Sequence, residues 1–261
     1  MEYALVSVAA LLVSAMALYS GFGLGTLLMP VFALFFPVPV AIASTAVVHL
    51  ANNLFRIGFA GRHADWRVVA IFGIPGAIAS IVGALLLTWV SRFTPLVTYG
   101  LGSRELSITP VKLVVAALIA GFAVLELTPA FARWKLDRKY LPLGGAISGF
   151  FGGLSGHQGA LRSAVLLGAG LSSAAFVGTG SIAASIVDVS RVVVYGPGVI
   201  RESFSQAGEG SVALVFVAIG AAFLGNYLGS RFLKKVTIGL IQRLVGVLLA
   251  VLAIALAAGL V

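Results

Sequence analysis

A membrane-length segment that contains an arginine occurs twice in this chain. Residues 41–61, AIASTAVVHLANNLFRIGFAG, resemble residues 176–196, FVGTGSIAASIVDVSRVVVYG, and Arg56 of the first copy aligns with Arg191 of the second. A charge inside a membrane segment costs roughly 2.5–3.5 kcal/mol on insertion scales. Because the same costly charge recurs in both copies, we predict a two-fold pseudosymmetric membrane fold in which both arginines have a role.

The composition indicates that most of the chain folds in lipid. Sixty per cent of the residues are hydrophobic and only 10% are charged, whereas soluble domains contain roughly a quarter charged residues. Apolar stretches of the ~20 residues that span a bilayer recur along the whole length. We therefore predict an all-α, polytopic membrane protein in which residues 1–261 form a single transmembrane domain, without a cleavable signal peptide.

The net charge of +9 has an ordinary explanation in such a protein. Lysines and arginines in cytoplasmic loops orient membrane proteins and contact anionic lipid head groups. The short loops offer no basic face with interleaved aromatic residues, which excludes nucleic-acid binding. The chain has no cysteine and its three histidines lack metal-ligand spacing, so we expect neither a metal site nor a cofactor. No nucleophile elbow or phosphate-binding loop is present, which disfavours an enzyme and ATP-driven transport.

The duplication extends to the glycine-rich sequences that precede the two arginine segments. We predict internal repeats of about 1–131 and 141–261, joined by a basic loop at 132–140. The apolar stretches 3–36 and 141–171 are too long for one crossing and are interrupted by glycines. These glycines are Gly21, Gly23 and Gly25 in the first stretch and Gly152, Gly153, Gly156 and Gly159 in the second. They indicate broken helices or hairpins, or alternatively close packing between helices.

The loop charges favour hairpins. If both long stretches return to the side from which they enter, most loop lysines and arginines gather on one face of the membrane, as the positive-inside rule requires. Single crossings would distribute them evenly. Each half would then cross the membrane an odd number of times, so we expect the two halves to be inverted and both termini to face away from the cytoplasm.

Polar residues form a stripe on each arginine-containing helix. In the first copy, Thr45, His49, Asn53 and Arg56 are spaced by three or four residues and share one face, together with Asn52,. The second copy repeats this spacing with Ser181, Ser185, Asp188 and Arg191. We expect both stripes to face the interior, where Asp188 can partly neutralise Arg191. The alternative is that both arginines snorkel to the membrane interface.

A second polar cluster, SGHQGALRS at residues 155–163, lies inside the second long stretch. A helix that restarts after Gly159 would present free N–H groups and the positive end of its dipole. Arg162 would add a donor for an oxyanion, with Ser163 beside it. His157 and Gln158 would contact the anion or, alternatively, bond backbone carbonyls freed by the break. The first half offers only Gly21, Gly23, Gly25 and Thr26 at the matching place, so we expect a lopsided site.

Glu126 lies near the end of its apolar segment and close to Arg133. This position favours an ion pair at the membrane interface over a proton relay.

The glycine-rich sequences SGFGLGTLLMP and SGFFGGLSGHQGALRSAVLL, each followed by a segment ending in Asn/Asp-x-x-Arg, resemble the TauE/SafE sulfite-exporter family. The repeated pattern spans essentially the whole chain. The resemblance implies a secondary transporter that exports sulfite, organosulfonates or related small anions across the bacterial inner membrane. This chain departs from the commonest family pattern at His157, Gln158 and Arg162, where other members carry more glycines and a proline.

The implied anion site would lie near the membrane midplane between inverted halves. The candidate substrate-binding residues are Arg162, Gln158, His157, Ser163, Arg56, Arg191, Asn53 and Asp188. Among them, Arg162 would bind the anion, Arg56 and Arg191 would shape the field or gate the site, and Asp188 would tune Arg191 or carry a coupling proton.

Two other functions stay open. The protein could transport a different organic anion, such as a carboxylate. It could also be a non-transporting interaction or assembly subunit, in which the glycines and polar stripes make helix contacts around a closed, dry core. The sequence allows a homo-oligomer and does not determine the oligomeric state.

Overall fold

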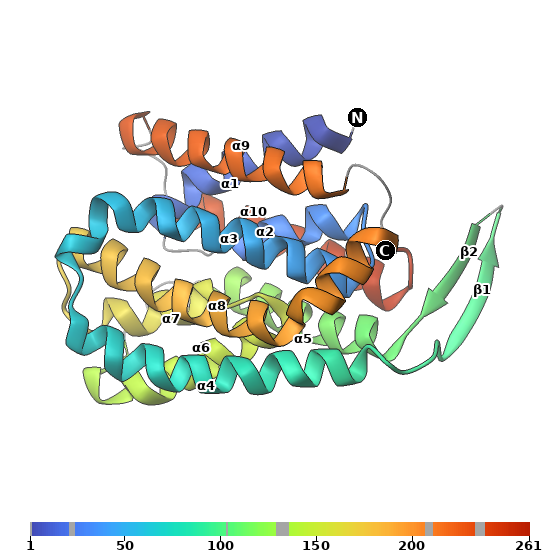
Figure 1. The fold of residues 1–261 in the computed structure, drawn as a ribbon, viewed down its shortest axis with the longest axis horizontal. Helices are drawn as coiled ribbons and strands as arrows, with labels where there is room; N and C mark the ends of the chain where they lie inside the picture. Colours follow the sequence, from blue (N-terminus) through green and yellow to red (C-terminus); the bar gives the residue numbers. More distant parts are fainter. Residues whose placement is uncertain (1, 21–23, 103, 129–135, 207–210, 233–237) are drawn as a thin grey trace.

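The computed structural model describes residues 2–20, 24–102, 104–128, 136–206, 211–232 and 238–261. These residues are almost entirely helical, and most of the helices run along the long axis of the molecule (Figure 1). The elements are α1 (Glu2–Ser20), α2 (Leu24–Ala33), α3 (Val38–Ala60), the short 3-10 helix η1 (Gly61–His63), α4 (Trp66–Val90), β1 (Val97–Leu101), β2 (Arg104–Ile108), α5 (Pro110–Leu127), the 3-10 helix η3 (Arg138–Tyr140), α6 (Leu141–Ser155), α7 (Gly159–Leu167), α8 (Ser173–Gln206), α9 (Ser211–Phe232) and α10 (Ile238–Ala257). The predicted all-α fold is confirmed.

Several helices are long and apolar enough to cross a membrane. Within the described residues there are five, namely Val38–His63, Trp66–Val90, Pro110–Leu127, Ser173–Tyr195 and Val212–Gly229. Their lengths match the roughly 20 residues needed to span the hydrocarbon core. The polytopic architecture is therefore confirmed.

Side-chain caps explain where two of these helices begin. Asp65 Oδ1 accepts a hydrogen bond from the N–H of Val68 at 3.0 Å at the start of α4. Thr109 Oγ1 accepts one from the N–H of Lys112 at 3.3 Å at the start of α5. Such oxygens satisfy N–H groups that have no partner within the helix, and Pro110 is tolerated in the first turn because it lacks an N–H.

Glycines allow two pairs of helices to pack very closely. Helix α6 packs against α4, and α1 against α9. Gly145, Gly149 and Gly153 lie along one face of α6, where an added Cβ would collide with backbone carbonyls of α4. Gly225 and Gly229 on α9 approach the backbone of α1 in the same way. These contacts are the small-residue packing typical of membrane helices. Of the two explanations offered for the glycines, a helix break or close packing, Gly153 fits the second.

Replacement of Gly149 by alanine is expected to lower the thermal stability of the protein. The new Cβ would overlap the carbonyl of Gly76 on α4, and overpacking costs typically about 1–3 kcal/mol. The control is Gly220→Ala on α9, where an added Cβ meets nothing within 4 Å. Thermal unfolding in detergent measures both variants, and equal melting temperatures would contradict the close packing of α6 on α4.

The second long stretch is a helical hairpin. Helix α6 ends at Ser155 because Gly156 adopts a left-handed conformation (φ 82°), and its N–H donates to the carbonyl of Gly152 at 3.0 Å. This conformation is readily available only to glycine. Helix α7 then returns along α6, so that Gly144 near the start of α6 lies against Val165 near the end of α7. The predicted break is confirmed in this half.

The first long stretch is also divided into two helices. Helix α1 ends at Ser20 and α2 begins at Leu24; Gly21 and Gly23 lie outside the described residues. An added Cβ on Gly25, in the first turn of α2, would lie 3.0 Å from the carbonyl oxygen of Gly156. The broken regions of the two long stretches therefore meet inside the molecule.

The start of α1 and the end of the chain lie toward the same end of the molecule, where a β-hairpin projects (Figure 1). Strands β1 and β2 pair antiparallel, with Val97 opposite Ile108. The Tyr99 hydroxyl donates to the carbonyl of Ala258, and Lys112 Nζ donates to that of Ser107 at 2.9 Å. This hairpin is an addition to the fold that the apolar pattern does not predict.

Candidate functional site

The carboxylate of Asp188 on α8 is the centre of a buried polar network. Its Oδ2 lies 2.6 Å from His49 Nδ1 and accepts from Asn53 Nδ2 at 3.3 Å, both on α3. Its Oδ1 accepts from Gln158 Nε2 at 3.0 Å. Both polar stripes thus face inward as predicted, and Gln158 joins the α6–α7 break to them.

Arg191 completes this network and holds the break in place. Its Nη2 and Nε donate to Asp188 Oδ1 at 2.7 and 3.1 Å, and its Nη1 donates to the carbonyl of Gly152 at 3.1 Å. The side chain is fully buried, so it does not snorkel. Because Asp188 neutralises the charge of Arg191, this guanidinium already has its partners within the protein.

Arg56 has a different environment from its counterpart. Its Nε donates to Asn226 Oδ1 at 3.0 Å and its Nη2 to the carbonyl of Ser14 at 3.2 Å. Asn226 and Ser14 in turn donate to Asn52 Oδ1, at 2.5 and 2.9 Å. Arg56 is 6% exposed, and no carboxylate of the described residues lies within 4 Å of it. Its neighbours orient the guanidinium without neutralising it.

Arg162, on the first turns of α7, is also buried without a close carboxylate. It is 6% exposed, and its Nη1 is buried with no hydrogen-bond partner among the described residues. Within that same part of the chain, it too has no carboxylate within 4 Å. A buried cation without a partner is costly, so this nitrogen is available to a ligand.

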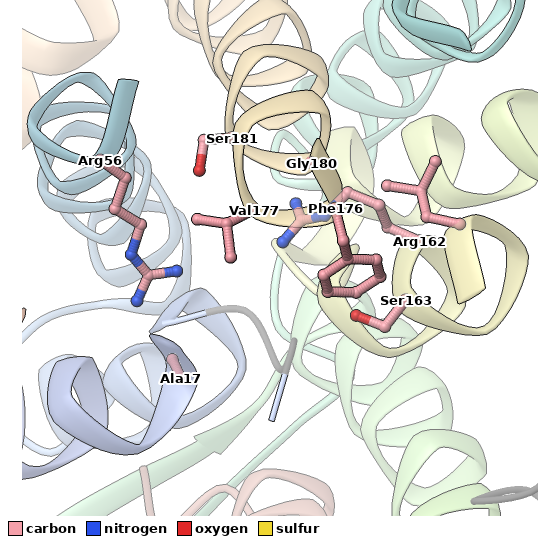
Figure 2. Close-up of a pocket in the computed structure, with 9 residues that line it drawn as sticks. Ala17, Arg56, Arg162, Ser163, Phe176, Val177, Gly180 and Ser181 are labelled. Carbon is pink, nitrogen blue, oxygen red and sulfur yellow. The ribbon is translucent and has the colours of Figure 1, made fainter. Parts of the chain in front are cut away.

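Arg56 and Arg162 line the same cavity (Figure 2). Their guanidinium groups approach it from α3 and α7, and the α8 segment from Phe176 to Ser181 lies between these helices (Figure 2). The full lining is Ala17, Arg56, Arg162, Ser163, Leu166, Phe176, Val177, Gly180 and Ser181. The cavity volume is about 20 Å³, which is room for a water-sized group. It is a small cavity with two guanidinium groups on its wall.

The predicted site residues fall into three places. Arg56, Arg162 and Ser163 line the cavity, whereas Asn53, Gln158, Asp188 and Arg191 form the network around Asp188. His157 belongs to neither group. Its Nδ1 lies 2.9 Å from the carbonyl oxygen of Ser155, and its ring stacks on Phe122 with the centroids 5.4 Å apart. This arrangement matches the alternative in which His157 bonds a carbonyl near the break.

Two functional candidates emerge only from the structure, and a third, His49, lies on the predicted polar stripe without a role assigned from the sequence. His49 contacts Asp188, and Asn226 and Ser14 position Arg56. Asn226 is a polar residue on the apolar helix α9, and this could have marked it as inward-facing. Ser14 has no comparable signal, because it contacts Arg56 through its backbone carbonyl and only its hydroxyl bonds Asn52.

Residues 6–256 match the family model of the sulfite exporter TauE/SafE. The chain belongs to the TauE/SafE family, which is a family of membrane transporters and not of enzymes. No curated protein and no solved structure matched the chain. The protein is therefore a multi-pass membrane transporter of the sulfite-exporter type.

Proposed function

We propose that this protein is a secondary transporter that exports small oxyanions, such as sulfite or organosulfonates, across the bacterial inner membrane. The observation that carries the proposal is the cavity shared by Arg56 and Arg162, two buried guanidinium groups without a carboxylate partner among the described residues. An anion bound between them would supply the missing negative charge to both.

The chemistry of the lining favours a sulfur oxyanion over a carboxylate. Guanidinium groups bind oxyanions through parallel, charge-assisted hydrogen bonds. A sulfite or sulfonate group has three oxygens on one sulfur and can bridge Arg56 and Arg162, which approach from different helices. A carboxylate presents only two oxygens in one plane. The hydroxyl-bearing Ser163 at the same wall adds a neutral polar group.

The cavity is too small for the proposed substrate in the observed conformation. About 20 Å³ holds a water-sized group but not a whole sulfite ion, so binding requires an outward movement of the lining helices. Helix α7 is short and belongs to a hairpin, which makes it the natural moving part. A cavity that carries two cations also argues against the assembly-subunit alternative, which needs a dry core.

The arrangement of the helices supports inverted repeats over about 1–131 and 141–261. The packing of α1 on α9 has its counterpart in that of α6 on α4, and α3 packs on α8. The two divided stretches meet at Gly25 and Gly156. In secondary transporters with this plan, the substrate lies where broken helices of the two halves meet, and Arg162 lies on α7, the helix that follows one of these breaks.

A thermal-shift comparison tests both binding and substrate class. Sulfite, thiosulfate and a two-carbon sulfonate should each raise the melting temperature of the purified protein, whereas acetate at the same ionic strength should not. A ligand at 100 times its Kd stabilises by about 2.7 kcal/mol. Stabilisation by acetate alone would indicate a different organic anion, and no stabilisation by any of the four would contradict the proposal.

A further inference from the structure

One buried carboxylate belongs neither to the cavity nor to the network around Asp188. Glu126, the residue before the end of α5, is 3% exposed. Both of its carboxylate oxygens are buried and have no hydrogen-bond partner among the described residues. The expected ion partner, Arg133, lies outside those residues. Glu126 is therefore not a water-exposed interfacial group.

The surroundings of Glu126 are apolar. Helix α10 packs on α5, and an added Cβ on Gly246 would lie 3.3 Å from Glu126 Cβ and closer still to Leu127. The described charged residues of the neighbouring helices are not buried with it: Lys112 lies at the opposite end of α5, and Arg67 on α4 and Arg243, one turn before Gly246 on α10, are exposed. Helix α6 contains no titratable residue. No described cation lies within 4 Å of the Glu126 carboxylate.

This environment accepts a carboxylic acid but not a carboxylate. A buried, unpaired ionised carboxylate costs many kcal/mol, and the C-terminal end of a helix carries a partial negative charge that adds to the cost. In the packing observed here Glu126 therefore holds a proton. It can ionise only if the ends of α5 and α10 separate enough to admit water.

Helix α5 also touches the α6–α7 break. Phe122 lies one turn before Glu126 on the same face of α5, and its ring stacks on His157 at an interplanar angle of 18°. His157 directly precedes Gln158, which bonds Asp188, and α7 with Arg162 follows. A movement of α5 that exposes Glu126 would thus act on the segment that carries Arg162.

We propose that Glu126 binds the coupling proton of the proposed transport cycle. A proton from the aqueous phase forms an O–H bond with the carboxylate when α5 and α10 close, and this bond breaks when they open. Among the residues whose burial is described, Asp188 is the other buried acid, but it is paired with Arg191 and His49, which keeps it ionised. The inference rests on the proposed transport function. The first of its two tests, by infrared spectroscopy, does not depend on that function.

Infrared spectroscopy of the purified protein tests the proton on Glu126 directly. A protonated carboxylic acid has a C=O stretching band separate from that of a carboxylate. We expect this band at neutral pH in the wild type and in Glu105→Gln, a control at an exposed carboxylate on β2. The band should be lost in Glu126→Gln. A spectrum of Glu126→Gln that matches the wild type would overturn the proposal.

Transport in proteoliposomes tests the coupling. With radiolabelled sulfite, Glu126→Gln should retain counterflow exchange but lose accumulation driven by a pH gradient by about tenfold or more, as coupling free energies typically allow. Glu105→Gln should retain both activities. Wild-type accumulation by Glu126→Gln would overturn the coupling role. Absence of counterflow in the wild type would instead refute the transport function, while the infrared result would still decide whether Glu126 holds a proton.

Discussion

Replacement of Arg162 by methionine is expected to weaken sulfite binding by about 10- to 150-fold, because hydrogen bonds to charged groups contribute about 1.5–3 kcal/mol. Methionine keeps much of the volume of the side chain and removes the charge. Equilibrium binding of radiolabelled sulfite to the purified protein measures the change. The sulfite affinity of Arg162→Lys should lie between those of the wild type and Arg162→Met, because an ammonium group keeps the charge but not the paired donors.

The same substitution should not destabilise the ligand-free protein. Arg162 Nη1 has no hydrogen-bond partner among the described residues, so methionine removes a buried, unpaired charge and can raise the melting temperature. A loss of binding with unchanged or increased stability is the signature of a ligand-binding residue. The control is Arg138→Ala, which removes a surface ion pair to Asp65 at 3.4 Å. Unchanged sulfite affinity in Arg162→Met would contradict the assignment.

Replacement of Asp188 by asparagine is expected to destabilise the protein by about 3–5 kcal/mol, the usual cost of removing one partner of a buried ion pair. Arg191, fully buried, would lose the group that neutralises it, and His49 would lose its closest partner. Thermal unfolding measures the effect. Asp137→Asn is the matched surface control, because its ion pair with Lys139 is exposed and such pairs contribute about 0–1 kcal/mol.

A double substitution separates the lost pair from general disruption. Asp188→Asn combined with Arg191→Met should be less destabilising than the sum of the two single changes, because the second removes the charge that the first leaves unpaired. Strict additivity, or wild-type stability of Asp188→Asn alone, would contradict the central position of Asp188 in the network.

Local pattern was enough to predict the helices, the glycine breaks and the inward direction of both polar stripes. Thr45, His49 and Arg56 share a face because of the helical repeat alone, and Gly156 ends α6 because its conformation suits glycine. Such features depend only on neighbours in the sequence. The polar stripes on α3 and α8 can therefore be predicted from the sequence before any tertiary contact is known.

Contacts between distant segments could not be predicted in the same way. Spacing along α8 pairs Asp188 with Arg191, but only packing brings His49 and Gln158 to the same carboxylate. It is also packing that leaves Arg56 beside Arg162, which lies on a different helix. From the sequence, His157 could contact the anion or bond a carbonyl near the break, and the hairpin turn directs its ring onto Phe122 and its Nδ1 to the carbonyl of Ser155.

The burial of Glu126 is another feature that the sequence could not predict. Its place near the end of an apolar segment predicts a wet interface, whereas the packing of α10 at Gly246 buries it. Likewise the strands β1 and β2 occupy a stretch between apolar segments that hydropathy treats as a loop. Both features depend on which helices meet, and hydropathy along one segment carries no information on that.

Uptake of radiolabelled sulfite into proteoliposomes tests most directly whether the Arg56–Arg162 cavity is a transport site. We expect saturable uptake with the wild-type protein and with Arg138→Ala, competition by a two-carbon sulfonate, and loss of uptake with Arg162→Met. Wild-type uptake no faster than the leak into protein-free vesicles, or an undiminished rate with Arg162→Met, would contradict the role of the cavity.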